Sequence, residues 1–202
     1  SLRNDSFHEV LVGDRPVTFS NEAAAVSDSF DDDLNQEQQL AVEYALLADE
    51  LFCIHGPPGT GKTRTLVEII RRAVDAGEDV LVCTDSNQAL DNLVAGNSIQ
   101  GDPDTESLHA YGQYGSGEFT LDRVNADRST HDVLRESYQD VAERAEVVAA
   151  TNSSAATLAR EFDLLVLDEA TQSTCTASCI PLARADRAVL AGDHQQLPPF
   201  TA

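Results

Sequence analysis

The sequence has no methionine and no tryptophan, and Lys62 is the only lysine among its 202 residues. Because a translated product begins with Met and this chain begins with Ser1, we expect a processed or excised piece of a longer product. The chain also lacks any apolar run near the roughly 20 residues that cross a bilayer, and no signal-peptide pattern opens it. We therefore expect a cytoplasmic protein.

Cysteine is scarce: Cys53, Cys83, Cys175 and Cys179 are too few to form a disulfide framework in a chain of this size. The first two lie in apolar runs, so we expect buried thiols. The last two are four residues apart, which would place them on one helix face. No second Cys/His pair lies nearby, so a metal site there is not favoured.

Basic residues are few as well, since 13 Lys and Arg face 35 Asp and Glu for a formal net charge of −22. The acidic residues are spread along the whole chain. In multimolar salt the Debye length falls to about 3 Å or less, which removes most of the repulsion between them. The composition therefore indicates a protein adapted to high salt. The other interpretation, a chain that repels nucleic acid, is not excluded by charge alone, because counterion release drives little binding in high salt for any protein.

Apolar residues make up 42% of the chain, which excludes wholesale disorder. Residues 1–33 are predicted to be a partial N-terminal segment that ends in an acidic linker, and residues 34–202 to form one domain. Residues 96–131 are predicted to be an irregular insertion with a short strand near 108–111. The predicted strands are 51–55, 79–84, 146–151, 162–170 and 187–192. The predicted helices are 34–50, 62–77, 87–95, 132–145 and 173–183.

Five apolar strands that alternate with helices predict an α/β fold with a mostly parallel sheet and helices on both of its faces. In such a sheet ligands bind where the carboxyl ends of the strands meet. Candidate functional residues are therefore sought at those ends.

The stretch GPPGTGKT follows the first predicted strand and opens a helix, as a phosphate-binding loop does. Its glycines let backbone N–H groups surround the β-phosphate, the lysine reaches the β- and γ-phosphates, and the final threonine binds Mg²⁺. The alternative is a glycine-rich turn that only starts a helix. The nucleotide-binding candidates are Gly56, Pro57, Pro58, Gly59, Thr60, Gly61, Lys62, Thr63 and the next residue, Arg64.

This motif explains why one lysine is present. Where solvation is the only task, lysine can be exchanged for Arg, Asp or Glu. A compact ammonium that fits between phosphate oxygens is harder to replace, because a guanidinium is larger and planar.

Two carboxylates, Asp168 and Glu169, follow the strand in LLVLDEATQ. Asp168 is predicted to hold Mg²⁺, and Glu169 to orient and polarise the attacking water. The alternative is that one of them only caps a helix. In LAGDHQQLPP, Asp193 and Gln196 are predicted to lie at the same sheet edge, where Gln196 would sense the γ-phosphate. The alternative there is an ordinary loop that ends at prolines.

Taken together in this order, the segments from about residue 34 to 200 resemble the superfamily 1 helicases of the Upf-like branch. LNQEQ is similar to the adenine-reading Q motif, VLVCTDSNQALDNL to motif Ia, DEATQ to motif II and GDHQQLPP to motif III. The resemblance implies a RecA-like P-loop NTPase that uses ATP and Mg²⁺. It adds Gln38 and Gln172 as nucleotide contacts, and it implies that Thr84, Ser86, Asn87 and Thr151 contact single-stranded DNA or RNA.

The sequence also departs from the family. Asp85 stands where motif Ia usually has proline, which puts a negative charge beside the expected phosphate path. Gln38 has a second explanation, because Asn35 and Gln38 also form a capping-box pattern. Both roles could hold together.

The resemblance further implies a second RecA-like domain, which follows this one in the family and carries an arginine finger. Without it we expect weak ATP binding and very slow hydrolysis. The leading hypothesis is the first motor domain of an ATP-dependent helicase. The alternatives are an ATP-dependent switch that does not unwind, and a nucleic-acid-binding scaffold with vestigial motifs.

Overall fold

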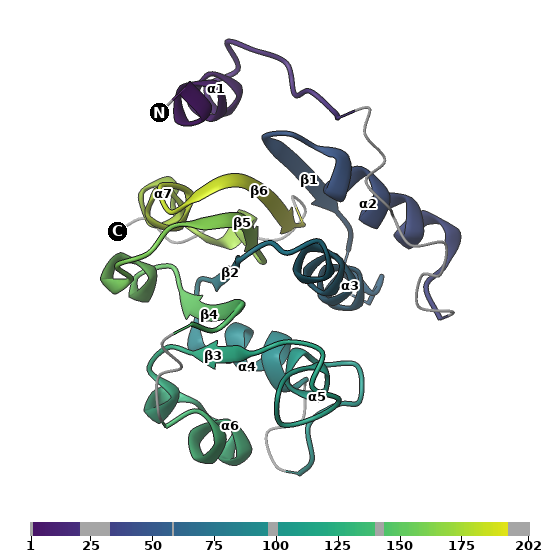
Figure 1. Cartoon of the computed structure of the whole chain (residues 1–202), viewed down its shortest axis with the longest axis vertical. Coiled ribbons are helices and arrows are strands. Elements are labelled where there is room, and N and C mark those ends of the chain that lie inside the picture. The colour runs from purple at the N-terminus through teal and green to yellow at the C-terminus, as the bar shows by residue number, and fades with distance from the viewer. Residues whose placement is uncertain (1, 21–32, 58, 97–100, 140–143, 194–202) are drawn as a thin grey trace.

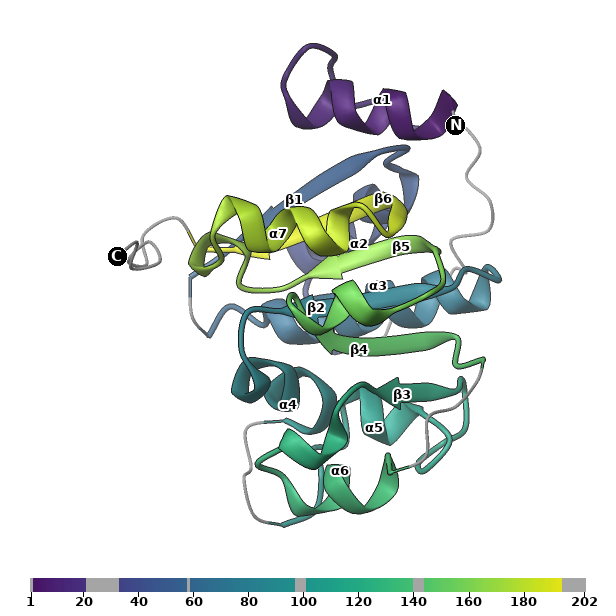
Figure 2. The same cartoon turned by 90° about the vertical axis from the view of Figure 1, so that its left-hand side faces the viewer.

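The computed structural model describes residues 2–20, 33–57, 59–96, 101–139 and 144–193, and its centre is a parallel sheet of six strands. Figures 1 and 2 show the strands stacked in the order β1-β6-β5-β2-β4-β3. Each strand pairs in parallel with its neighbours. The strands are β1 Leu51–His55, β2 Val80–Thr84, β3 Leu121–Arg123, β4 Val147–Thr151, β5 Phe162–Leu167 and β6 Ala185–Gly192.

Helices cover both faces of the sheet, so the predicted α/β architecture is confirmed. The α-helices are α1 Leu2–Leu11, α2 Gln36–Leu47, α3 Lys62–Asp75, α4 Asn87–Ala95, α5 Leu108–Tyr111, α6 Asp132–Ser137 and α7 Cys175–Leu182. The 3-10 turns are η1 Ala126–Arg128, η2 Ser154–Thr157 and η3 Ala170–Gln172.

Successive residues of each strand point to opposite faces, which divides the core into two layers. Val80 and Val82 of β2 pack with α2, α3, α4 and the insertion on one face. Leu81 and Cys83 of the same strand pack with Phe7 of α1 and with α7 on the other face. Because both faces are covered, β2 is buried along its whole length, as a nearly continuous apolar run predicts.

The insertion differs from the expected structure. Residues 108–111 form the short helix α5 instead of a strand, because the hydroxyl of Ser107 accepts from the backbone N–H of Ala110 and caps a helical turn. The additional strand is β3, which pairs with β4 at the edge of the sheet. Helix α6 ends at Ser137 and so is shorter than the predicted helix 132–145, part of which lies outside the described residues.

The cysteines follow the sheet order. Cys83, in a central strand, is fully buried, and burial raises the pKa of its thiol. Cys53 is exposed, contrary to expectation, because β1 is an edge strand of the described sheet. Cys175 and Cys179 are both exposed on α7.

In the described part of the chain, no helix has the length and apolar character needed to cross a membrane.

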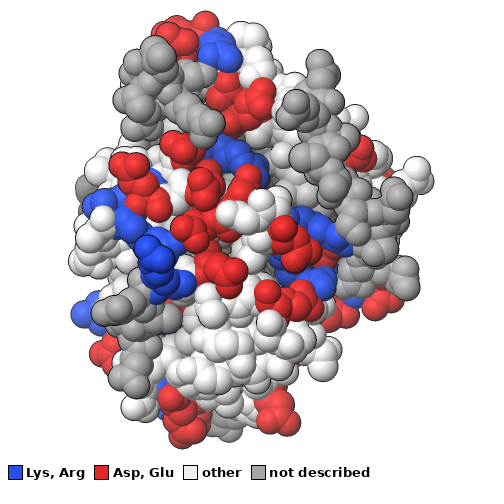
Figure 3. Space-filling view, in the orientation of Figure 1, with Lys and Arg blue, Asp and Glu red and all other residues white. Residues whose placement is uncertain are grey.

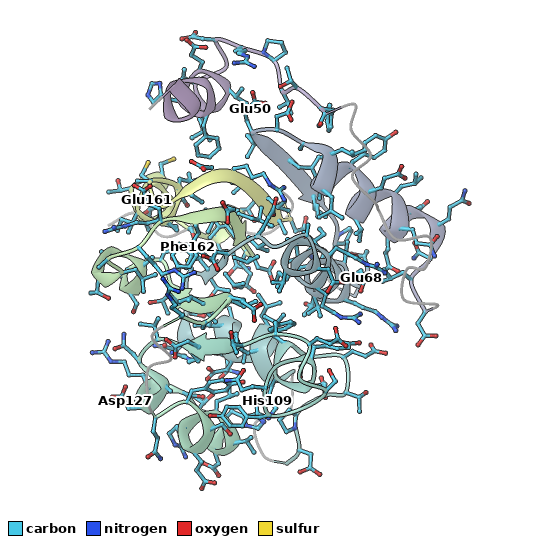
Figure 4. All side chains as sticks on the ribbon, in the orientation of Figure 1. Glu50, Glu68, His109, Asp127, Glu161 and Phe162 are labelled. Carbon is cyan, nitrogen blue, oxygen red and sulfur yellow. The ribbon has the colours of Figure 1, made fainter. Side chains whose placement is uncertain are left out.

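The segment before residue 20 packs against the main sheet. Phe7 of α1 is 3% exposed in the core, and α1 contacts β1 and β6. Glu50, labelled in Figure 4 near the start of β1, accepts from Arg15 and from the backbone and hydroxyl of Thr18. That residues 1–33 are a partial N-terminal segment, separate from the domain that follows, stays a prediction.

Figure 3 shows acidic side chains scattered over the face that it draws.

Candidate functional site: a phosphate loop and a carboxylate pair

The phosphate loop connects β1 to α3 at the carboxyl edge of the sheet. Gly59 and Gly61 both have a φ of +81°, a conformation that glycine adopts without the steric cost of a side chain. Gly61 is the N-cap of α3. A Cβ at Gly56 would lie 2.7 Å from the Thr60 hydroxyl and 3.3 Å from Cγ of Lys62. The tightly curled loop therefore favours glycine at these positions: Gly59 and Gly61 have positive φ, and Gly56 has little room for a side chain. Pro58 lies outside the described residues.

Lys62 begins α3, and its side chain turns back over the loop. Its ammonium donates to the carbonyl oxygens of Gly56 at 2.6 Å and Pro57 at 3.2 Å. These neutral acceptors are weaker partners for an ammonium than phosphate oxygens are. The lone lysine is thus held at the mouth of the loop, where a phosphate could replace the carbonyls.

The carboxylate pair lies across the same pocket. Asp168 directly follows β5 and is 9% exposed, and its Oδ1 accepts from the backbone N–H of Glu169 at 2.8 Å. Burial raises the pKa of Asp168, although the N–H of Glu169 and the ammonium of Lys62 lower it in part. Burial also raises the pKa of Glu169, and the charges of Asp168 and Asp85 add to this effect.

Glu169 is one of two non-glycine residues in the described chain with a positive φ, here +54°. This conformation is uncommon outside glycine and asparagine and turns the chain sharply away from β5 into η3. Glu169 does not act as a side-chain cap, because its side chain makes no capping hydrogen bond to η3.

One pocket of about 840 Å³ joins these groups. Lys62 and Thr63 line it from α3, and Asp168 and Glu169 line it from the end of β5. Residues a hundred positions apart thus meet in a single cavity, as the sequence predicts. Gly59, Gly61, Arg64, Gln172 and Asp193 also line it.

The Thr63 hydroxyl and the Asp168 carboxylate are the hard oxygen ligands that Mg²⁺ prefers. No group of three or more His, Cys, Asp or Glu side chains is arranged to hold a metal among the described residues. Thr63 and Asp168 line the same pocket, which fits a Mg²⁺ ion held by one or two protein oxygens together with phosphates and water.

Thr171 joins η3 to the end of β6 and was not singled out from the sequence. Its hydroxyl donates to the carbonyl of Asp193 at 3.1 Å and accepts from the Asp193 N–H at 3.2 Å. A Cβ on Gly192 would lie 2.9 Å from the Thr171 methyl group, so this close approach requires glycine. The contact fixes Asp193 beside the carboxylate pair. Gln196 lies outside the described residues, and its role stays a prediction.

Gln38 uses its side chain in two contacts. With Asn35 it forms the complete capping box of α2, in which its Oε1 accepts from the Asn35 N–H. Its Nε2 donates to the carbonyl of Thr60 in the phosphate loop at 3.1 Å. The capping pattern seen in the sequence is therefore confirmed, and the amide also touches the nucleotide loop.

Arg64, one residue beyond the loop, is tied to two acidic side chains. Its guanidinium lies 2.9 Å from Asp33 and 2.8 Å from Glu106. Glu106 comes from the insertion and lines the pocket, a placement that no sequence pattern indicated. Arg64 thus connects the end of the phosphate loop to Asp33, which precedes the loop in the sequence, and to Glu106, which follows it.

The predicted nucleic-acid contacts gather at the carboxyl ends of β2 and β4, where Thr84 and Thr151 are paired in register. Both threonines are buried, and their hydroxyls donate within the chain, to the Ser86 carbonyl and to the Ser154 hydroxyl. Ser86 is exposed and caps α4, and Asn87 is half-buried. Ser86 and Asn87 are therefore the more accessible of the four.

Asp85 lies between these contacts and the carboxylate pair. Its Oδ1 accepts from the Ser173 hydroxyl at 3.4 Å, and Ser173 in turn accepts from Asn152 at 2.8 Å. The charge that stands in place of the usual proline therefore lies on an exposed side chain with one weak contact.

Comparisons with known proteins identify the family and agree with the fold. A family model described as "AAA domain" matches residues 33–109 and 118–202. DNA-binding protein SMUBP-2 of Rattus norvegicus is 34% identical, over 92% of this chain and 23% of that protein. DNA polymerase alpha-associated DNA helicase A of Schizosaccharomyces pombe is 31% identical, over 98% of this chain and 37% of that protein.

Among solved structures, T4 UvsW has a TM-score of 0.56 at 13% identity, over 93% of this chain and 34% of that one. This likeness supports the fold. The chain spans about a quarter to a third of the length of the two curated relatives. The family model covers most of the chain, and both relatives exceed 30% identity. The chain therefore belongs to the AAA domain family and is a first RecA-like domain of the superfamily 1 helicase type.

Proposed function

We propose that this chain binds Mg–ATP at its phosphate loop and acts as the first motor domain of the full-length protein. That protein would be an enzyme that couples ATP hydrolysis to translocation along single-stranded DNA or RNA and to duplex unwinding. The observation that carries the proposal is the single pocket that joins Lys62 and Thr63 to Asp168 and Glu169. A second RecA-like domain would complete the ATP site. We further propose a cytoplasmic location and adaptation to high salt.

Each group has a distinct part in the proposed reaction. The N–H groups of the loop and the Lys62 ammonium hold the β- and γ-phosphates. Thr63 and Asp168 would hold Mg²⁺, which would neutralise charge on the phosphates. The Glu169 carboxylate accepts a hydrogen bond from the attacking water and orients it, a task that suits a carboxylate whose pKa is raised.

Replacement of the lysine tests nucleotide binding. Lys62→Ala removes a charge-assisted hydrogen bond of about 1.5–3 kcal/mol, so ATP affinity should fall about ten- to a hundredfold. Lys62→Arg should recover only part of it, because the guanidinium does not fit the loop. Affinity is measured by calorimetry in molar KCl with Mg²⁺.

Arg135→Ala is the matched control, because it removes one positive charge from α6, away from the pocket lining. It should leave ATP affinity within about twofold, since screening in molar salt removes distant charge effects. Equal affinity of wild type and Lys62→Ala would contradict the phosphate-loop assignment.

A switch that does not unwind is the second candidate. Asp85 favours it, since a negative charge at the expected strand path weakens contact with phosphates. Single-strand stimulation of ATP hydrolysis in the full-length protein, lost with Lys62→Ala, supports the motor. Hydrolysis that no single strand stimulates supports the switch.

A further inference from the structure

Arg123 is the largest fully buried side chain in the described chain, and it lies at the end of β3, outside the nucleotide pocket. A guanidinium has five N–H donors and no acceptor. Its Nε and Nη2 donate to Oδ1 of Asp91 on α4 at 3.3 and 3.0 Å. Its Nη1 donates to the carbonyls of Val124 and Asn125.

The remaining donor of Nη2 reaches Oδ1 of Asn87 at 3.0 Å, so all five have partners. Asp91 is equally saturated, since its second oxygen accepts from Ser129 and Thr130. A buried ion pair of this kind adds little to stability compared with an apolar pair of the same volume. Its position suggests a different task.

The contact with Asn87 sets which end of that amide faces outward. Because a guanidinium cannot accept a hydrogen bond, the amide oxygen must face Arg123 and the amide nitrogen must face away. Phosphate oxygens of a nucleic-acid backbone only accept hydrogen bonds, so they need donors. Arg123 therefore presents Asn87, a predicted nucleic-acid contact, in the one orientation that suits a phosphate.

The same network reaches Thr151, another predicted nucleic-acid contact. Asn125 lies two residues after Arg123 and has a φ of +57°, a conformation that asparagine tolerates better than most residues. Its Nδ2 donates to the hydroxyl of Ser154 at 3.0 Å, and that hydroxyl also accepts from Thr151 at 2.8 Å. A continuous series of hydrogen bonds thus joins the start of α4 to the turn after β4.

We propose that Arg123 and Asn125 are positioning residues for the single-strand surface: they orient the Asn87 amide and fix the spacing between α4 and the turn after β4. We call Asp91, Arg123, Asn125 and Ser154 the brace. This inference rests on the nucleic-acid contact in the proposed function. It assigns to the outward-facing Asn87 amide nitrogen the role of hydrogen-bond donor to a backbone phosphate.

The test measures binding of fluorescein-labelled oligothymidylate to the full-length protein, by anisotropy at the lowest salt at which the protein is folded. ATP affinity and Tm are measured on the same samples. Asn125→Gly removes the amide and keeps the backbone conformation, since glycine adopts positive φ freely. Arg123→Lys keeps the charge beside Asp91 but cannot supply five donors.

Both substitutions should weaken oligothymidylate binding about three- to tenfold, because they misplace the donor of one charge-assisted hydrogen bond to a phosphate without removing it. ATP affinity should stay within about twofold. In the Arg123→Lys background, Asn87→Ala should add little further loss, because the amide is no longer oriented. Ser116→Ala is the control: it removes a hydroxyl from the same insertion, outside the brace, and should leave strand binding unchanged.

If Asn125→Gly and Arg123→Lys lower Tm but leave oligothymidylate affinity unchanged, the brace is only structural and the proposal is overturned. If Arg123→Lys does not fold, Asn125→Gly alone decides. A wild-type protein that does not bind oligothymidylate overturns the proposal too. In that case the ATP affinity of the same sample shows separately whether the nucleotide-binding function stands.

Discussion

Gln38 shows how one side chain can have two explanations that a sequence cannot separate. Its oxygen is engaged by the Asn35 N–H and its nitrogen by the Thr60 carbonyl. In this structure the amide therefore supports the phosphate loop, whatever it does with a nucleobase. A Cβ on Gly61 would lie 2.3 Å from its Nε2, so the support is also in close contact with the N-cap of α3.

We predict that Gln38→Ala weakens the binding of both ATP and GTP, about three- to tenfold, because the phosphate loop, which both nucleotides use, loses its hydrogen bond from Gln38. Gln39→Ala is a matched control, since Gln39 donates to the Leu34 carbonyl and does not contact the loop. Competition against a fluorescent nucleotide measures both affinities. A loss confined to ATP would show instead that Gln38 reads adenine.

At the residue scale, motifs with a physical reason for each position could be predicted from the sequence, and long-range partners could not. Lys62 and Asp168 were placed correctly in one pocket because the loop and the strand end each specify their own geometry. Glu106 beside Arg64 and Thr171 beside Asp193 were missed. Those contacts depend on how separate segments pack, and no local pattern encodes them.

At the scale of elements, the insertion is stabilised by buried polar side chains. His109 of α5, labelled in Figure 4, contacts the Tyr138 hydroxyl at 3.0 Å through Nδ1. Burial lowers the pKa of His109, and the neighbouring His131 lowers it further. Burial raises the pKa of Tyr138, so the phenol stays neutral. Helix α5 is thus joined to Tyr138, the C-cap of α6, through two uncharged rings.

We predict that acid destabilises the chain through His109. Its pKa is lower in the folded state, so its contribution is complete above the unfolded value of about 6.5 and is lost as pH falls through the folded value. Unfolding in urea at pH 7.5 and pH 5.5 measures the effect. Burial raises the pKa of Asp122, which acts in the opposite direction but in the more acidic range where carboxyl groups titrate.

His109→Gln should show a smaller loss of unfolding free energy between these two pH values than wild type. His8→Gln is the control, because His8 is exposed on α1 and its replacement should leave the full loss in place. An identical pH dependence in wild type and His109→Gln would exclude His109 as the cause.

Elements with strong apolar patterns were predicted within a few residues, and the insertion was not. Strand β2 is a continuous run of buried residues, and helix α3 has 14 residues, one buried face and a clear end signal in Gly77 at a φ of +86°. The segment 108–111 has four residues, too few for a helix period to differ from a strand period. The cap provided by Ser107 decided the outcome.

At the scale of the whole molecule, 35 acidic residues against 13 basic ones give strong self-repulsion in dilute salt. We predict that the unfolding free energy rises as KCl increases from 0.2 M to 3 M, because screening removes this repulsion. Each kcal/mol gained raises Tm by about 2–4 °C in a chain of this length. Thermal unfolding followed by circular dichroism measures it.

Sucrose at matched osmolality is the control for excluded-volume and hydration effects, and should raise Tm less than KCl does. Greatest stability at 0.2 M KCl would contradict adaptation to high salt.

The order of the strands also belongs to the scale of the whole molecule. It could not be predicted, because it depends on which helix covers which face, while the parallel direction follows from the alternation of strands and helices.

The account depends on a lysine and two carboxylates that share one triphosphate with its magnesium ion. The most direct measurement is a crystal structure of this protein grown with Mg²⁺ and a non-hydrolysable ATP analogue. We predict γ-phosphate oxygens within hydrogen-bond distance of the Lys62 Nζ, Mg²⁺ on the Thr63 hydroxyl, and Asp168 on the ion directly or through water. An analogue bound elsewhere, with Lys62 still on the carbonyls of Gly56 and Pro57, would contradict it.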